Sequence, residues 1–189
     1  ESRRLEAGTV VPEPNGACTV GWPEYQRGQV AVIFATLFAA PARKKEAGDT
    51  IMYADSQTAH RLYRDQIDFY RRLSDSHPDK FCLIASRKEL DTVIQDWSKP
   101  ARADEGHPVG LIYLMEGADG IRSPHELAEW YDLGLRMIGL SWAGTRYAGG
   151  TSEPGPLTDE GRKLLSAMMD FNFLLDLSHM DEAAALESL

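Results

Sequence analysis

The chain has 189 residues, of which 43% are hydrophobic and 26% charged, a balance typical of one globular domain with a sizeable core. Its net charge of −9 argues against nucleic acid and anionic membrane surfaces as partners, because both need a positive footprint. No apolar run approaches the ~20 residues that cross a bilayer. Cys18 and Cys82 are too few for a disulfide framework.

From residue 29 onward, segments with strand character alternate with segments with helix character. Residues 1–28 are rich in proline and glycine and are expected to be irregular. Apolar, β-branched runs predict strands at residues 29–38, 81–85, 109–115, 137–142 and 173–177. Helical spacing and capping residues predict helices at residues 54–74, 86–97, 123–134, 158–170 and 181–189.

This alternation implies βα units, parallel strands and right-handed crossovers. A doubly wound sheet and a TIM-type (β/α)₈ barrel both fit, but no glycine-rich phosphate loop follows the first strand, which weakens the nucleotide-binding alternative. A barrel usually takes ~250 residues. We therefore expect one domain over residues 1–189, a partial barrel of about five βα units that is truncated at one or both ends.

Two of the predicted strands end near side chains that can bind metal ions. Alternation along residues 110–116 places Glu116 last in an inward-facing apolar row. The same count along residues 173–179 places His179 last in its row, and it turns Asp176 toward the helices as a structural residue. Barrels carry their chemistry at this end of the strands. Glu116 could instead cap a loop or pair with a basic neighbour, and His179 could be a satisfied core or surface residue.

Further candidates follow the fourth predicted strand. Trp142 ends that strand and is expected to form a pocket wall, although ordinary core packing is an equal alternative. The glycine-rich loop 143–155 is expected to contact substrate. Its Arg146 could hold a carboxylate with two hydrogen bonds or remain a solvated loop cation.

At these residues the chain resembles the membrane (renal-type) dipeptidase family, the M19 metallopeptidases, and particularly its bacterial members. The resemblance spans most of the sequence from Trp22 onward. Its most specific pieces are Glu116-Gly117, residues 133–140, residues 155–161 and Asp176-Leu-Ser-His179.

The resemblance implies a (β/α)₈ barrel with two zinc ions, in which Glu116 bridges both metals and His179 binds one. We further expect Trp142 and Tyr147 to line the substrate pocket. The family's His-x-Asp pair on the first strand and its later His, Arg and Asp have no counterpart in this chain, and Trp142 stands where the family often has a substrate-contacting His.

We therefore predict a zinc-dependent dipeptidase that hydrolyses small dipeptides with metal-activated water. Two protein ligands are fewer than the three of a usual catalytic zinc, so this stretch alone is expected to be inactive. The alternatives are a related metal-dependent amidohydrolase acting on another small amide or lactone, and a non-catalytic truncated barrel. Exposed strand edges make a homo-oligomer possible. The N-terminus, which begins at Glu1, shows no signal peptide, which favours a cytoplasmic location.

Overall fold

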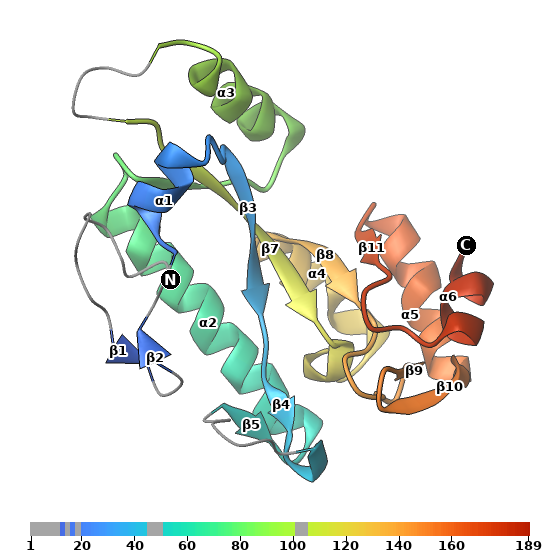
Figure 1. Ribbon diagram of the computed structural model, residues 1–189. Helices are drawn as coiled ribbons and strands as arrows, with labels where there is room; N and C mark the ends of the chain where they lie inside the picture. Colours follow the sequence, from blue (N-terminus) through green and yellow to red (C-terminus); the bar gives the residue numbers. More distant parts are fainter. Residues whose placement is uncertain (1–11, 14–15, 18–19, 45–50, 101–105) are drawn as a thin grey trace. The chain divides into compact units, whose positions relative to one another are not determined.

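The computed structural model describes residues 12–13, 16–17, 20–44, 51–100 and 106–189 (Figure 1). Contacts within the chain cluster into two compact units, residues 1–35 with 68–112 and residues 36–67 with 113–189. Three elements contribute residues to both units, namely β3 (Val32–Leu37), α2 (Ser56–Ser76) and β7 (Val109–Glu116). The single domain expected over residues 1–189 stays a prediction.

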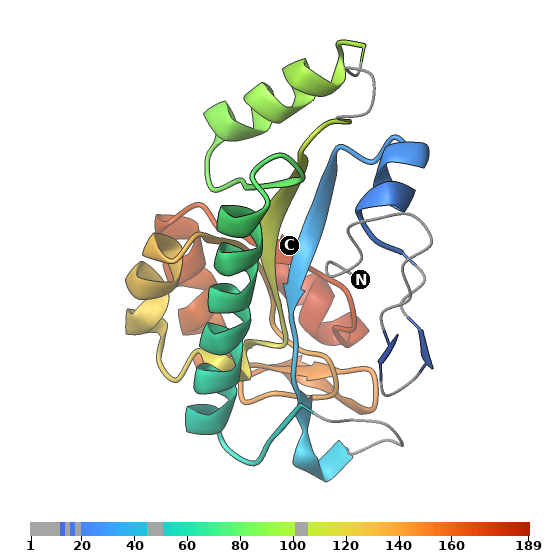
Figure 2. The same cartoon turned by 90° about the vertical axis from the view of Figure 1, so that its left-hand side faces the viewer.

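The first unit combines parts of these shared elements with several short ones. Its other described elements are β1 (Pro12–Glu13), β2 (Gly16–Ala17), α1 (Trp22–Arg27), β6 (Phe81–Leu83) and α3 (Arg87–Trp97). The strands β6 and β7 pair in parallel. The helix α2 is one uninterrupted element of 21 residues, as its long amphipathic periodicity predicts (Figure 2).

The helix α1 lies inside the segment that the sequence predicts to be irregular. It begins after Gly21, whose backbone N–H donates a 2.9 Å hydrogen bond to the Glu24 carboxylate. Pro23 occupies the first turn, where its missing N–H costs nothing. The prediction of irregular structure is therefore wrong for residues 22–27, because a local cap supports a helix too short for hydrophobic periodicity to reveal.

The predicted start of α3 is confirmed. The Ser86 hydroxyl accepts the Glu89 backbone N–H at 3.3 Å and donates to the Glu89 carboxylate at 2.9 Å. The same carboxylate accepts the Ala85 N–H at 2.8 Å. Side chains thus satisfy backbone donors that the first helical turn leaves without partners.

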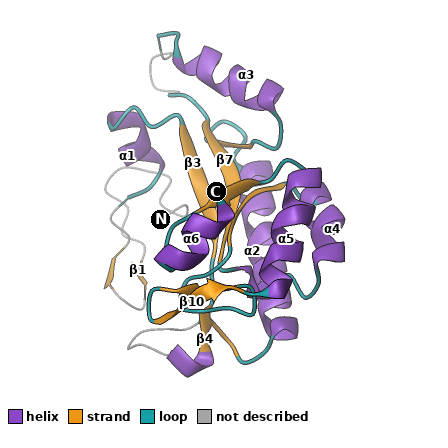
Figure 3. Ribbon diagram, turned by 90° about the vertical axis from the view of Figure 1, so that its right-hand side faces the viewer, coloured by secondary structure: helices purple, strands orange, loops and turns teal. Residues whose placement is uncertain are grey.

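The second unit contains the carboxyl ends of β3 and β7, six further strands and the last three helices of the chain, which Figure 3 labels. Its strands are β4 (Ala40–Pro41), β5 (Met52–Tyr53), β8 (Leu135–Gly139), β9 (Ala148–Gly150), β10 (Glu153–Leu157) and β11 (Leu174–Asp176). Its helices are α4 (Leu127–Asp132), α5 (Asp159–Asp170) and α6 (Glu182–Ser188), with 3-10 turns at Ala42–Lys44, Ala118–Gly120 and Pro124–Glu126.

The main sheet has the hydrogen-bonded order β11-β8-β7-β3, with β6 also paired to β7. The pairs β6–β7, β7–β8 and β8–β11 are parallel. The predicted α/β class with parallel strands is confirmed. Among the described residues, no helix combines the length and the apolar character needed to cross a membrane.

Two expectations about the strand ends are wrong. The strand β8 ends at Gly139 rather than at residue 142, and the expected loop 143–155 contains the antiparallel hairpin β9–β10. Thr145 shapes this region, because its hydroxyl donates to the Leu140 carbonyl at 2.7 Å and accepts the Tyr147 N–H at 3.1 Å. Such side chain–backbone bonds offer the chain an alternative to continued strand pairing.

The two faces of the sheet in the second unit differ in burial. Met115 of β7 and Ile138 of β8 are fully buried, as is Trp130 of α4, which packs against β8. The opposite face carries Glu116, with a side chain 25% exposed, and Leu174, which is 54% exposed. Glu116 therefore ends the less buried row of its strand, not the buried row that alternation suggested.

Candidate metal site at the carboxyl end of the sheet

Glu116 is the last residue of β7, and the backbone after it turns sharply. Gly117 has φ +83°, in the left-handed region that favours glycine. The hydroxyl of the buried Tyr63 lies 3.2 Å from the Glu116 carbonyl oxygen and 3.0 Å from that of Gly117. This buried phenol holds the turn and thereby the position of the Glu116 side chain.

The Glu116 carboxyl group lies in an environment that disfavours its charge. Burial raises the pKa of Glu116, and the nearby Asp176 carboxylate raises it further. The His179 imidazole acts in the opposite direction on this pKa, through charge and hydrogen bonding, but it compensates only in part. A cation at this carboxylate would remove the cost of ionising it.

His179 reaches Glu116 from a turn rather than from a strand. The Asp176 carboxylate accepts the Ser178 N–H at 2.9 Å, an Asx-type turn that ends β11. His179 then adopts φ +64°, an uncommon conformation for a residue with a side chain. Its Nε2 lies 3.1 Å from Glu116 Oε1. The structure thus brings the two predicted metal ligands together, by a route that alternation does not describe.

Asp176 faces the same side of the sheet as Glu116. In the parallel pairing Glu116 is the partner of Gly139, and Gly139 is the partner of Asp176. A side chain on Gly139 would place its Cβ 3.6 Å from the Asp176 carboxylate, so glycine keeps the space between the two acids open. The expectation that Asp176 points toward the helices is wrong, because β11 ends before His179 and alternation cannot be counted across the turn.

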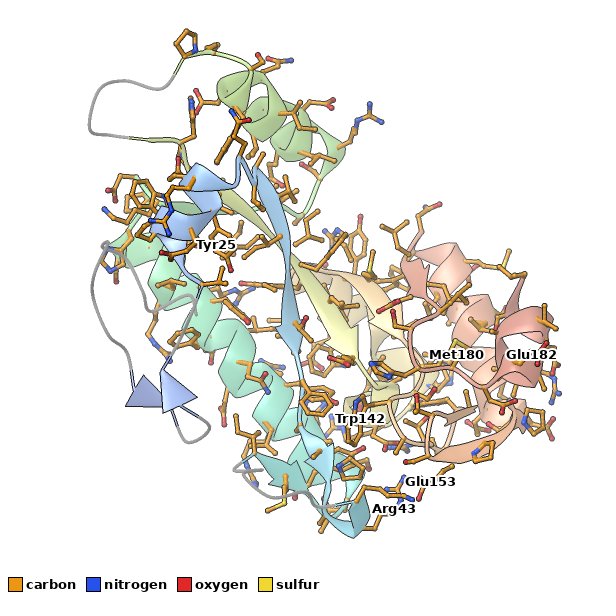
Figure 4. All side chains as sticks on the ribbon, in the orientation of Figure 1. Tyr25, Arg43, Trp142, Glu153, Met180 and Glu182 are labelled. Carbon is orange, nitrogen blue, oxygen red and sulfur yellow. The ribbon has the colours of Figure 1, made fainter. Side chains whose placement is uncertain are left out.

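Trp142, which Figure 4 labels, follows β8 rather than ending it, and its ring lies beside that of His179. The two ring centroids are 6.5 Å apart with planes at 62°. Phe38 packs edge-on against the same indole, at a centroid distance of 5.2 Å. The interpretation of Trp142 as a wall of the candidate site stays a prediction, and its contact with the His179 ring is consistent with it.

Arg146 and Tyr147 have partners away from the Glu116–His179 pair. The Arg146 guanidinium donates to the carbonyl oxygens of Asp119 at 3.2 Å and Arg122 at 3.0 Å. Tyr147 is fully buried, and its hydroxyl donates to the Ile121 carbonyl at 2.5 Å. Both side chains brace the segment after Glu116, and a substrate-binding role for them stays a prediction that their present partners do not support.

The hairpin β9–β10 is attached to the 3-10 turn at Ala42–Lys44 by an ion pair (Figure 4). The Arg43 guanidinium donates to the Glu153 carboxylate at 2.7 and 3.1 Å and to the Gly144 carbonyl at 2.6 Å. Glu153 also accepts the Gly144 N–H at 3.0 Å. These hydrogen bonds, led by those from Arg43, lower the pKa of Glu153 to about 2.

This shift predicts acid sensitivity of the second unit. A carboxyl pKa lowered by folding stabilises the protein above its unfolded value of about 4.3, and this contribution is lost as pH falls toward about 2. Glu153→Gln should lower the free energy of unfolding at pH 7 by at most about 1 kcal/mol, because solvent screens the half-exposed Arg43. Urea unfolding at pH 7 and pH 3 measures this. The difference in the free energy of unfolding between the natural chain and Glu153→Gln should be smaller at pH 3 than at pH 7. An equal difference at both pH values would contradict the lowered pKa of Glu153.

The donor set suits a metal ion but is incomplete. A carboxylate oxygen and an imidazole nitrogen are typical zinc ligands, and the two already face each other across 3.1 Å. Within the described part of the chain, no group of three or more His, Cys, Asp or Glu side chains is arranged to hold a metal. Glu116 and His179 therefore fit as part of a site that needs further donors.

An α/β protein with a parallel sheet and a paired glutamate and histidine at its carboxyl edge is the class that this fold and site define. Residues 11–189 match the model of the membrane dipeptidase family, peptidase family M19. The chain belongs to this family, whose members are metallopeptidases, as its motifs predict. A comparison with curated protein sequences finds no match.

Solved structures resemble this chain over most of its length at low identity. The dipeptidase AC, a metallopeptidase of family M19, is 21% identical with a TM-score of 0.71, over 94% of this chain and 50% of its own. A Rhodobacter sphaeroides metallopeptidase liganded with a phosphinate mimic of the dipeptide L-Ala-D-Ala is 19% identical with a TM-score of 0.68, over 87% and 51%. An amidohydrolase from Pseudomonas aeruginosa is 14% identical with a TM-score of 0.68, over 88% and 44%. The chain spans about half the length of these structures, and the likeness concerns the fold.

Two features of this site were not found from the sequence. Asp176 lies on the same face of the sheet as Glu116 because of the strand register. Thr151 of the β9–β10 hairpin contacts His179 only because the chain folds the two segments together. An Asp two residues before Ser178 was a usable sign of an Asx turn, and it would have warned that alternation stops at Asp176.

Proposed function

We propose that this chain forms part of a zinc-dependent dipeptidase with a binuclear metal site. The observation that carries the proposal is the 3.1 Å approach of His179 Nε2 to Glu116 Oε1 at the carboxyl end of the sheet, in a chain of the M19 family. Glu116 would hold both metals and His179 one of them. The barrel of which this sheet would be a part belongs to the same proposal.

The residues of this chain have distinct roles in that proposal. Glu116 would bind through its carboxylate, which burial and the Asp176 charge leave in need of a cation. Bound zinc would polarise a substrate carbonyl and lower the pKa of a coordinated water toward ~7. Asp176, across Gly139 from Glu116, would add negative charge that favours cations at this edge. Trp142 would limit the space beside His179.

Zinc binding and substrate class are tested separately. Zinc affinity is measured by competition with a chromophoric chelator, and we expect the chain to bind zinc weakly, since it offers two protein donors. A phosphinate mimic of L-Ala-D-Ala, followed by ³¹P NMR, should bind only when zinc is present. With two protein donors, hydrolysis of L-Ala-D-Ala by this chain alone should be slow or absent. A chain that binds no zinc would contradict the metal assignment.

The second candidate is an amidohydrolase acting on another small amide or lactone. It is favoured by the fold similarity to the Pseudomonas aeruginosa amidohydrolase, because the TM-score of 0.68 equals that for the Rhodobacter sphaeroides metallopeptidase. A chain that binds zinc but not the dipeptide phosphinate, and instead binds a transition-state mimic of another amide or of a lactone, would favour it. Zinc binding without affinity for any such mimic would favour a non-catalytic role.

A further inference from the structure

The turn of the β9–β10 hairpin contacts the far side of the His179 ring. Thr151 Oγ1 lies 3.2 Å from His179 Nδ1, the ring nitrogen that does not face Glu116. The same hydroxyl lies 3.4 Å from the His179 backbone carbonyl oxygen. Both nitrogens of the imidazole therefore have an oxygen partner, Glu116 on one side and Thr151 on the other.

The backbone around Thr151 is held in place. Its N–H donates to the Trp142 carbonyl at 3.1 Å, and its neighbour Gly150 forms an antiparallel bridge with Met180. The Asp181 N–H donates to the Gly149 carbonyl at 3.1 Å. The turn that carries the hydroxyl and the segment that carries the imidazole are thus joined through the backbone directly beside the contact, and α6 lies against β10 in the same region (Figure 3).

The geometry also suits the chemistry of a hydroxyl group. A threonine hydroxyl has one proton to donate and lone pairs to accept with. If it donates to the His179 carbonyl, its lone pairs are free to accept a hydrogen bond from Nδ1–H when a metal occupies Nε2. A ligating histidine usually has its other ring N–H held in this way, which fixes both the tautomer and the ring orientation.

We propose that Thr151 is a positioning residue, whose hydroxyl holds the Nδ1 side of the His179 ring and directs Nε2 at Glu116. The consequence for zinc rests on the proposed function, but the contact itself does not. Thr151 touches no reacting atom. It acts by keeping His179, whose backbone has the uncommon φ of +64°, in the one ring orientation that points at the carboxylate.

The test compares Thr151→Val, which keeps the shape and loses the hydroxyl, with Thr151→Ser, which keeps the hydroxyl. The chain is labelled with ¹⁵N-histidine, and two-bond ¹H–¹⁵N spectra of the zinc-free protein report the environment of each ring nitrogen of His179. We expect the same His179 ring signals in the natural chain and in Thr151→Ser, and a changed Nδ1 signal in Thr151→Val, because only that variant loses the hydroxyl 3.2 Å from Nδ1. Zinc affinity should fall roughly tenfold in Thr151→Val and stay within about twofold in Thr151→Ser.

Ser152→Ala is the matched control. Ser152 belongs to the same turn, but the hydroxyl that contacts His179 is that of Thr151. It should change neither readout. The same His179 spectrum in Thr151→Val as in the natural chain would overturn the proposal. If no variant binds zinc but the Nδ1 signal still changes in Thr151→Val, the positioning contact stands and the metal function alone fails.

Discussion

Glu116→Gln is expected to weaken zinc binding by at least on the order of a hundredfold while leaving the zinc-free protein as stable as before, or more stable. The amide is a poor metal ligand, so the affinity falls. The stability does not fall, because folding raises the pKa of Glu116 through burial and the Asp176 charge, so its ionised form is disfavoured in the folded state. Chelator competition and urea unfolding at pH 7 measure the two effects.

The expected effect of Glu116→Gln on stability follows from the coupling between folding and proton binding. A carboxyl whose pKa is raised by folding stabilises the protein most at low pH, and that contribution is lost once the group must ionise. Glutamine removes the ionisation. Glu153→Gln is the matched control with the opposite pattern, since the pKa of Glu153 is lowered by Arg43: it should keep the zinc affinity and lose stability at pH 7. A Glu116→Gln protein that is less stable than the natural chain and still binds zinc would contradict the assignment of Glu116 as a metal ligand.

Gly150→Ala is expected to lower the free energy of unfolding by about 3 kcal/mol, which is large for one added methyl group. A Cβ at this position would lie 1.5 Å from the Ala143 carbonyl oxygen and 2.8 Å from that of Trp142. Both obstacles are backbone atoms, so no side chain can rotate away and the hairpin must shift. Because Thr151 follows directly, zinc affinity should fall as well. Thermal or urea unfolding together with chelator competition tests both effects.

Gly155→Ala is the control in the facing strand of the same hairpin. Among the described residues, a Cβ there would meet only the Gly149 Cα, at an ordinary 3.9 Å, so stability and zinc affinity should be close to those of the natural chain. Equal stability of the two alanine variants would show that the approach of Gly150 to Ala143 does not constrain this hairpin.

Local rules predicted much of the secondary structure. Ser86 and Thr158 cap their helices as expected, with the Thr158 hydroxyl accepting the Gly161 N–H at 3.0 Å. Each of the five predicted strands has a counterpart, although β8 and β11 are shorter than the apolar runs that predicted them. Hydrophobicity marks the presence of a strand, whereas its end is set by hydrogen bonds such as that of the Asp176 side chain.

The candidate site was only partly predictable. Glu116 follows directly from its place at the end of an apolar run, and its pairing with His179 is what the family motifs imply. The contact with His179 is nevertheless made from a turn with a left-handed backbone, and strand alternation does not apply there. The partners of Arg146 are backbone carbonyls, which no pattern of side-chain types could indicate.

The sequence by itself determined the α/β class, the starts of α3 and α5, the family, and the choice of Glu116 and His179 as the residues that meet near the carboxyl edge of the sheet. These depend on periodicity, capping and short motifs, which act over a few residues. The tertiary structure decided that Asp176 faces Glu116, that Thr151 holds the His179 ring and that Arg146 braces a turn. Those contacts join residues about 25 to 60 positions apart, and they depend on strand register and turn geometry, which are set only when the sheet and hairpin pack.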